Sequence, residues 1–122
     1  MVNKQDYMNA INQNIEMVRG DTLAFNFQLM GLGSRAAYEA LDVAFAVTEN
    51  YDKAALFEVT NGNGIELESY ENDTATFSVC VAPELTKNID VMRYFYDLQI
   101  KDTANVITLM RGYLTLVYDV AE

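Results

Sequence analysis

Histidine and tryptophan are absent from the 122-residue sequence, and cysteine and proline each occur once. Without histidine there is no Ser-His-Asp or Cys-His triad, no imidazole metal ligand and no side chain of the commonest general-base type. One cysteine and no histidine cannot supply a structural zinc site. Residues 31–34 contain too few glycines for a phosphate-binding loop and are not followed by its lysine. The residues therefore predict a protein that is not an enzyme and carries no cofactor.

Basic residues are also few, with 8 lysines and arginines against 18 aspartates and glutamates, a formal charge of −10. Such a charge disfavours binding to nucleic acid and to anionic membranes. The N-terminus has no secretory signal pattern, and no apolar run approaches the ~20 residues of a membrane span. Synthesis in the cytoplasm and a soluble product are expected. The single Cys80 is expected to be a buried or half-buried small residue, as free cysteines usually are.

The aromatic content, eight tyrosines and six phenylalanines, favours sheets. Alternation of apolar and polar residues is strongest near the C-terminus. In residues 93–100 the even positions Tyr94, Tyr96, Leu98 and Ile100 form an apolar face, and the odd positions a wetter one. The same period of two predicts strands at residues 15–18, 22–30, 41–48, 56–59, 65–69, 75–81, 93–100 and 106–120.

Between these strands the chain carries turn signals. Asn61-Gly62-Asn63-Gly64 predicts a type I′ turn, and residues 71–74 predict a hairpin. Residues 36–40 are compatible with one helical turn, and Pro83 predicts a short helical turn near residues 83–88. Gly112 inside a strand predicts a bulge or a close backbone approach. The fold class is therefore all-β, an antiparallel immunoglobulin-like sandwich of about seven to eight strands over residues 15–122. Residues 1–14 form either an arm or a short helix.

Few residues suggest chemistry. Carboxylates at Glu66, Glu68, Glu71 and Asp73 form the best candidate calcium cluster, although a solvated strand face explains them better; calcium binding is left open. Arg19-Gly20-Asp21 spells an adhesive tripeptide, but a bend at Gly20 with Asp21 accepting backbone hydrogen bonds explains it better.

Two groups of residues suggest contacts. Asp97 is expected to be a charge on the wet face of its strand, or a charge paired across strands with Arg111 or Arg93; a catalytic acid is the less favoured alternative. The tyrosines suggest an interaction surface consisting of Tyr94, Tyr96, Tyr113 and Tyr118.

Several segments, in this order and spacing, resemble small β-sandwich domains of tailed-phage and prophage structural proteins. The nearest example is the N-terminal domain of upper baseplate proteins in phages of Gram-positive hosts. The resemblance covers roughly residues 15–120 and rests on residues 18–22, 83–86, 94–100, 108–109 and 112–116.

The resemblance implies a non-enzymatic virion component of the tail or baseplate, or a fibre anchor, made in the bacterial cytoplasm. Its partners would be other phage structural proteins or further copies of itself. The sequence ends at Glu122 without the fibre or receptor-binding region of that family, which leaves open an adaptor, a decoration protein or a separate anchor. Two alternatives remain: a carbohydrate- or protein-binding sandwich module and a small carboxylate-dependent hydrolase.

Overall fold

A computed structural model describes residues 11–118 and is nearly all β. The predicted all-β class is thus confirmed, and the helical elements of residues 11–118 are one short α-helix and one 3₁₀ turn. The elements are β1 (Ile11–Asn12), β2 (Ile15–Val18), β3 (Leu23–Met30), α1 (Arg35–Glu39), β4 (Asp42–Thr48), β5 (Phe57–Asn61), β6 (Gly64–Glu71), β7 (Thr74–Val81), η2 (Pro83–Leu85), β8 (Arg93–Lys101) and β9 (Val106–Val117).

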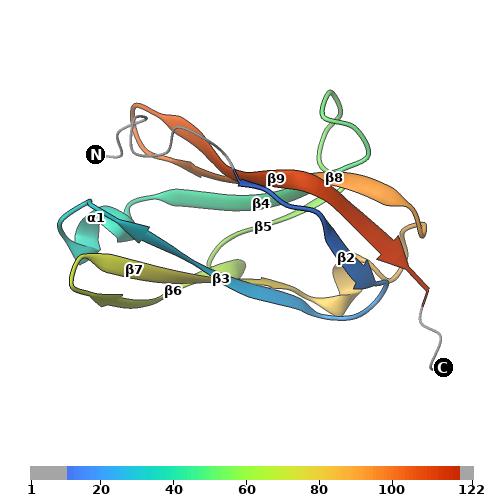
Figure 1. Cartoon of the computed structure of the whole chain (residues 1–122), viewed down its shortest axis with the longest axis horizontal. Coiled ribbons are helices and arrows are strands. Elements are labelled where there is room, and N and C mark those ends of the chain that lie inside the picture. Colours follow the sequence, from blue (N-terminus) through green and yellow to red (C-terminus); the bar gives the residue numbers. More distant parts are fainter. Residues whose placement is uncertain (1–10, 119–122) are drawn as a thin grey trace.

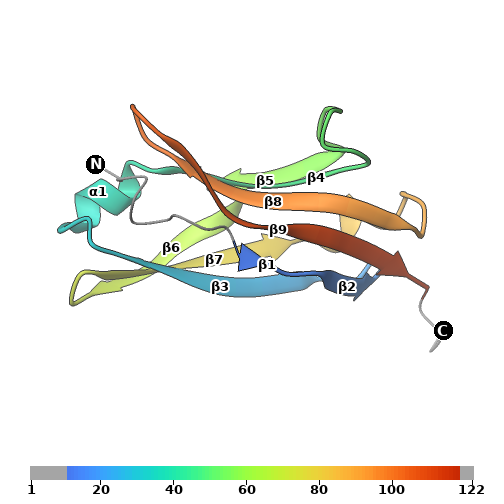
Figure 2. The same ribbon diagram turned by 45° about the horizontal axis from the view of Figure 1, so that its top comes forward.

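The strands form one curled, nearly closed sheet in the order β1-β9-β8-β4-β5-β6-β7-β3, with β2 also pairing to β9. Figures 1 and 2 show β4, β5, β8 and β9 on one side of the molecule and β3, β6 and β7 on the other. The two sides are joined through β5 and β6, whose parallel ladder is only two residue pairs long: Thr60 with Gly64 and Asn61 with Ile65. Over residues 11–118 the main path of the sheet has eight strands, in line with the predicted seven to eight, and β2 lies off this path. The sheet is not purely antiparallel as predicted, because three of its pairings are parallel.

The core lies between the two sides and is built from alternate residues of each strand. The even positions of β8 are buried as predicted, because a strand turns successive side chains to opposite faces. The Phe45 ring packs against rings from both sides of the sheet, with its centroid 5.6 Å from that of Phe25 and 5.3 Å from that of Tyr96. The fully buried large side chains are Tyr38, Phe45, Ile65, Phe77, Tyr96, Leu98, Ile100, Leu114 and Leu116 together with Val43 and Val47.

The type I′ turn lies elsewhere than the sequence predicted. At residues 61–64 only Gly62 and Gly64 have positive φ, and the loop joins the parallel strands β5 and β6. The β6–β7 hairpin instead has positive φ at both central residues, 50° at Asn72 and 55° at Asp73. That pattern is the one a type I′ turn requires. The Asn-Gly signal was misread because the chain crosses between the two sides there rather than folding straight back.

Two of the segments that carry the phage resemblance lie together in space. Gly20, at φ +85°, makes the bend between β2 and β3, as predicted. Its N–H donates to the hydroxyl of buried Thr86 at 2.9 Å, just after η2. Arg19 donates to the Ile89 carbonyl at 3.2 Å. Asp21, expected to accept hydrogen bonds, is exposed and donates its own N–H to the Val18 carbonyl at 3.1 Å.

The N-terminal part of the described chain is extended and runs parallel to β9. β1 pairs with Met110 and Arg111, and β2 pairs with residues 114–117. Between them the Gln13 carbonyl lies so close to Gly112 that any Cβ there would collide with it. The close backbone approach predicted at Gly112 is confirmed, whereas the register shift of β8 and β9 falls at Leu98 and Gln99. Residues 1–10 of the predicted arm or helix, and the predicted strand end at residue 120, fall outside the described residues.

Candidate binding face

The solvent-facing side of β4, β5, β8 and β9, called the outer face below, carries a cluster of aromatic and arginine side chains and a polar hollow. The odd positions of β8 point outward because its even positions fill the core. The pairing of β8 with β9 and β4 determines the neighbours of these residues. Phe95 lies opposite Tyr113 on β9 and Thr48 on β4. Asp97 lies opposite Arg111 on β9 and Ala46 on β4.

Three aromatic rings contact one another in tilted pairs across this face, between two arginines, and this group is called the aromatic ladder. The Phe95 ring centroid lies 4.8 Å from that of Tyr51 and 5.2 Å from that of Tyr113. The guanidinium of Arg93 sits 4.5 Å from the Tyr113 ring, and that of Arg111 sits 4.7 Å from the Tyr51 ring. Ring pairs and arginine–ring pairs each contribute about 0.5–1.5 kcal/mol, so the ladder is held in place. Tyr51 and Tyr113 nevertheless remain 42% and 37% exposed.

Tyr51 reaches the ladder from the loop between β4 and β5, which projects at the top of Figures 1 and 2. The buried Thr48 hydroxyl shapes this loop: it lies 2.7 Å from the Asn50 carbonyl and 3.3 Å from those of Lys53 and Ala54. The Tyr51 hydroxyl donates to the carbonyls of Tyr96, at 3.2 Å, and Gly112, at 3.4 Å. The loop therefore carries its tyrosine in a fixed position.

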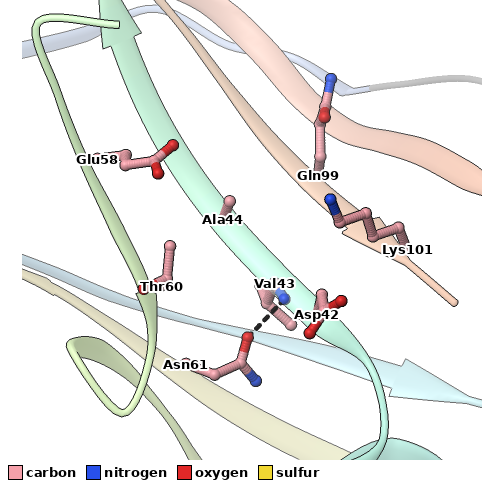
Figure 3. A pocket seen from close by; sticks show the side chains of 8 residues that line it. All are labelled: Asp42, Val43, Ala44, Glu58, Thr60, Asn61, Gln99 and Lys101. Atoms are coloured by element: carbon pink, nitrogen blue, oxygen red, sulfur yellow. Dashed lines mark hydrogen bonds between the residues drawn. The ribbon is translucent and has the colours of Figure 1, made fainter.

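Beside the ladder runs a shallow trough, called the polar trough. Its floor is Ala44 and Ala46 on β4, which are too small to fill the space between the side chains of β5 and β8. Figure 3 shows one end, a hollow of about 450 Å³. The Asn61 side chain closes its lower edge, accepting from the Val43 N–H at 2.6 Å and donating to the Leu41 carbonyl at 3.1 Å. This end of the trough is lined by Asp42, Val43, Ala44, Glu58, Thr60, Asn61, Gln99 and Lys101. The other end is lined by Ala46, Thr48, Tyr51, Lys53, Ala55, Asp97 and Gln99.

Asp97 lies where the trough meets the ladder. Burial raises the pKa of its carboxyl above the ordinary value, and the positive charge of Arg111 opposes that rise in part. Gln99 donates to the Asp97 carboxylate at 3.4 Å. Arg111 is the cross-strand neighbour, as expected, but its guanidinium lies over Tyr51, and the ion pairs within residues 11–118 are Arg35–Glu39 and Lys53–Glu49. A half-buried carboxylate thus faces the trough with only a weak partner.

The four tyrosines of the predicted interaction surface do not share one surface. Tyr94 and Tyr96 are 2% and 0% exposed, so these two were wrong: their own alternation places them in the core. Their hydroxyls donate to the carbonyls of Asp90 and Gln13. Tyr113 is exposed on the aromatic ladder, and Tyr118, 67% exposed, lies under Arg19 beyond the end of β9.

Sequence reasoning missed two members of the ladder. Phe95 carried a usable signal, because it is an aromatic residue on the wet face of an alternating strand. Tyr51 carried none, since it lies between the predicted strands at 41–48 and 56–59 and its position depends on how that connection folds back.

Of the four acidic candidates on β6 and in the β6–β7 turn, Glu68 and Asp73 make hydrogen bonds within the fold. Glu66 and Glu68 are exposed on the face opposite buried Ile65, as predicted, and the Glu68 carboxylate accepts from Ser78 at 2.7 Å. Asp73 accepts from the N–H groups of Gly31 and Gly33. Among the described residues, no three Cys, Asp or Glu side chains lie close enough together to hold a metal ion.

Cys80 differs from expectation. It is exposed on the outward side of β7, opposite Ala24 of β3, rather than buried or half-buried. The predicted alternation is correct, since Phe77, Val79 and Val81 face the core. The expectation of burial failed because it assigned a small apolar role to a residue on the solvent side.

Neither the protein-family models nor the curated protein sequences contain a match to this chain. Over residues 11–118 there is also no helix with the length and apolar character that crossing a bilayer would need.

Proposed function

We propose that the curled sheet is an immunoglobulin-like sandwich, with β4, β5, β8 and β9 as one layer and β3, β6 and β7 as the other. The Tyr94 hydroxyl supports this proposal, because it donates to the Asp90 carbonyl, four residues upstream, at 2.7 Å. Tyr94 stands at the start of β8, after the corner made by η2. A tyrosine at that corner bonding back to the backbone is a hallmark of immunoglobulin-like folds.

We propose further that the chain is a non-enzymatic structural protein of a phage or prophage virion, acting through protein–protein contacts. It would be a tail, baseplate or fibre-anchoring component, made in the host cytoplasm and assembled with other virion proteins. The resemblance of residues 15–120 supports the assignment to a phage or prophage virion, and the outer face supports a role in protein–protein contacts. The single observation on which that second part rests is the aromatic ladder.

The ladder has the composition of a protein-binding surface. Tyrosine and arginine are enriched at the energetic centres of interfaces, where rigid aromatic side chains lose little conformational entropy on binding. Here Tyr51 and Tyr113 are exposed yet held by tilted ring contacts with Phe95 and, for Tyr51, by hydrogen bonds. A partner would find this part of its binding surface already ordered.

The test uses a host strain that carries the gene. Particles released after prophage induction should contain the chain, detected by immunogold labelling and mass spectrometry. A Tyr51→Ala/Tyr113→Ala double variant should fold but be lost from the particles. Tyr118→Ala is the control, because it removes an exposed tyrosine outside the ladder and should still be incorporated. Normal, infectious particles that lack the chain would contradict the proposal.

The polar trough favours a second candidate, a carbohydrate-binding module. A sugar ring could lie against the exposed aromatic face of Tyr51 while its hydroxyls bond to the carboxylate and amide groups of Asp97 and Gln99. Binding on a glycan array that is lost in both Tyr51→Ala and Gln99→Ala would favour this function over assembly. No binding to any glycan would leave assembly as the better proposal.

A further inference from the structure

Within residues 11–118, β3 is a long strand that pairs with a neighbour along one edge only, and its other edge is open. All eight of its residues, Leu23–Met30, pair with β7 in an unbroken register, and β3 stands at the end of the strand order. An open edge presents unpaired N–H and C=O groups that can pair with another strand. Figure 2 shows β3 at the border of its layer.

This edge lacks the features that commonly prevent such pairing. Proteins protect edges with charges, prolines, bulges or short strands. β3 contains no charged residue and no proline, and its ladder has no bulge. Its neighbour β7 is also free of charged residues over Thr74–Val81. At the other end of the strand order, β1 and β2 are only two and four residues long, and β2 carries Glu16.

The inward side of β3 leaves apolar surface uncovered. Leu23, Phe25 and Phe27 face the core but are only half-buried. Their partners on β7 are at most 1% exposed, although Phe27 stacks on Phe77 at 5.1 Å. A strand added beside β3 would cover these side chains and use the free backbone groups in the same step.

We infer that the β3 edge binds the β3 edge of a second copy of this chain, antiparallel about a two-fold axis. Two chains of charge −10 repel each other through most of their surfaces, so they can approach closely only where charge is absent. β3 and β7 provide such a surface, and antiparallel pairing of identical strands is self-complementary. The inference goes beyond the proposed function, because the outer face stays free in the dimer.

The first test is sedimentation equilibrium up to millimolar concentration. The wild type should dimerise, and Asn26→Lys/Gln28→Lys, at outward positions of β3, should raise the dissociation constant at least about tenfold. Asn63→Lys/Thr103→Lys is the matched control: it adds the same charge at exposed turn positions and should have a much smaller effect. Unchanged melting temperatures would exclude unfolding as the cause. A wild type that stays monomeric, or equal effects of both double variants, would overturn the inference.

The second test uses Cys80, which is exposed on β7 and can carry a spin label without mutation. In the proposed dimer the two Cys80 residues are three strand spacings apart, roughly 14 Å measured across the sheet. Dipolar coupling between labels should therefore appear with dimerisation and vanish in Asn26→Lys/Gln28→Lys. A dimer without such coupling would use another surface and would overturn the inference. Tyr51→Ala/Tyr113→Ala should leave the dimer intact, which separates this result from the test of the outer face.

Discussion

At the scale of single residues, Asp73 joins three segments that are distant in sequence. Its carboxylate accepts from the N–H of Gly33 at 2.7 Å and of Gly31 at 3.0 Å. It also accepts from the hydroxyl of Tyr38, on α1, at 3.2 Å. One side chain of the β6–β7 hairpin thus fixes both the loop after β3 and the helix. Chiefly because the Gly33 N–H stabilises the charged form, the pKa of Asp73 lies below its usual value.

Replacing Asp73 with asparagine should therefore destabilise the protein. The amide keeps the side-chain shape but exchanges one accepting oxygen for a donor, which cannot pair with the N–H groups of Gly31 or Gly33. We expect Asp73→Asn to lower Tm at neutral pH by about 5 °C. Glu71→Gln, which neutralises an exposed carboxylate of the same hairpin, should leave Tm nearly unchanged. Equal Tm values for the two variants would contradict this role.

The same carboxylate makes the protein acid-sensitive. Because its pKa is lower in the fold than the ordinary 3.8, the folded state binds fewer protons than the unfolded state near that pH. The stability it adds is complete above about pH 4 and is lost as pH falls towards the lowered value. The Tm gap between wild type and Asp73→Asn should therefore narrow on acidification below about pH 4. Melting curves across that range, by circular dichroism, test this.

Asp97 should have the opposite pH dependence. Burial raises its pKa above 3.8, so the folded state binds more protons than the unfolded state between the two values. Stability then falls as pH rises through that window, and the penalty is complete at neutral pH. We expect Asp97→Asn to raise Tm at pH 7, with the gain disappearing below about pH 4. Glu58→Gln, an exposed carboxylate on β5 across Ala46, should give no comparable gain.

At the scale of elements, the β6–β7 hairpin depends on backbone conformation at its tip. Asn72 has φ 50°, which asparagine tolerates and alanine does not. We expect Asn72→Ala to lower the free energy of unfolding by about 1 kcal/mol, measured by urea denaturation. Asn72→Gly should stay closer to the wild type, since glycine adopts positive φ without steric cost. If alanine were tolerated as well as glycine, the hairpin would not rely on this conformation.

The sequence predicted individual strands well and their connections less well. Alternation located β2 at Ile15–Val18 and β4 to within one residue, because the period of two reports directly which face is buried. The same alternation placed Phe95 and Asp97 on the wet face. It could not show that residues 11–18 run parallel to β9, because pairing partners depend on tertiary structure. For the same reason the ladder position of Tyr51 was not predictable from its turn sequence.

At the scale of the whole molecule, the two proposed contact surfaces differ in charge from each other and from the rest of the chain. The chain as a whole carries a formal charge of −10, whereas β3 and β7 are uncharged and the aromatic ladder is flanked by two arginines. Contacts through the ladder would involve the cations Arg93 and Arg111, and contacts through β3 would involve backbone and apolar groups. Added salt should therefore weaken binding through the aromatic ladder and strengthen binding through the β3 edge.

This separation gives a prediction for the β3-paired dimer. Between about 0.1 M and about 1 M NaCl the Debye length falls from ~10 Å to ~3 Å, which screens the repulsion between two chains of charge −10. Because no ion pair at the β3 edge is lost in exchange, we expect the dissociation constant to fall several-fold, measured by sedimentation equilibrium. An interface built on arginine–carboxylate pairs would instead weaken with salt. Dissociation of the dimer at high salt would therefore move the interface away from β3 and towards the arginines of the outer face.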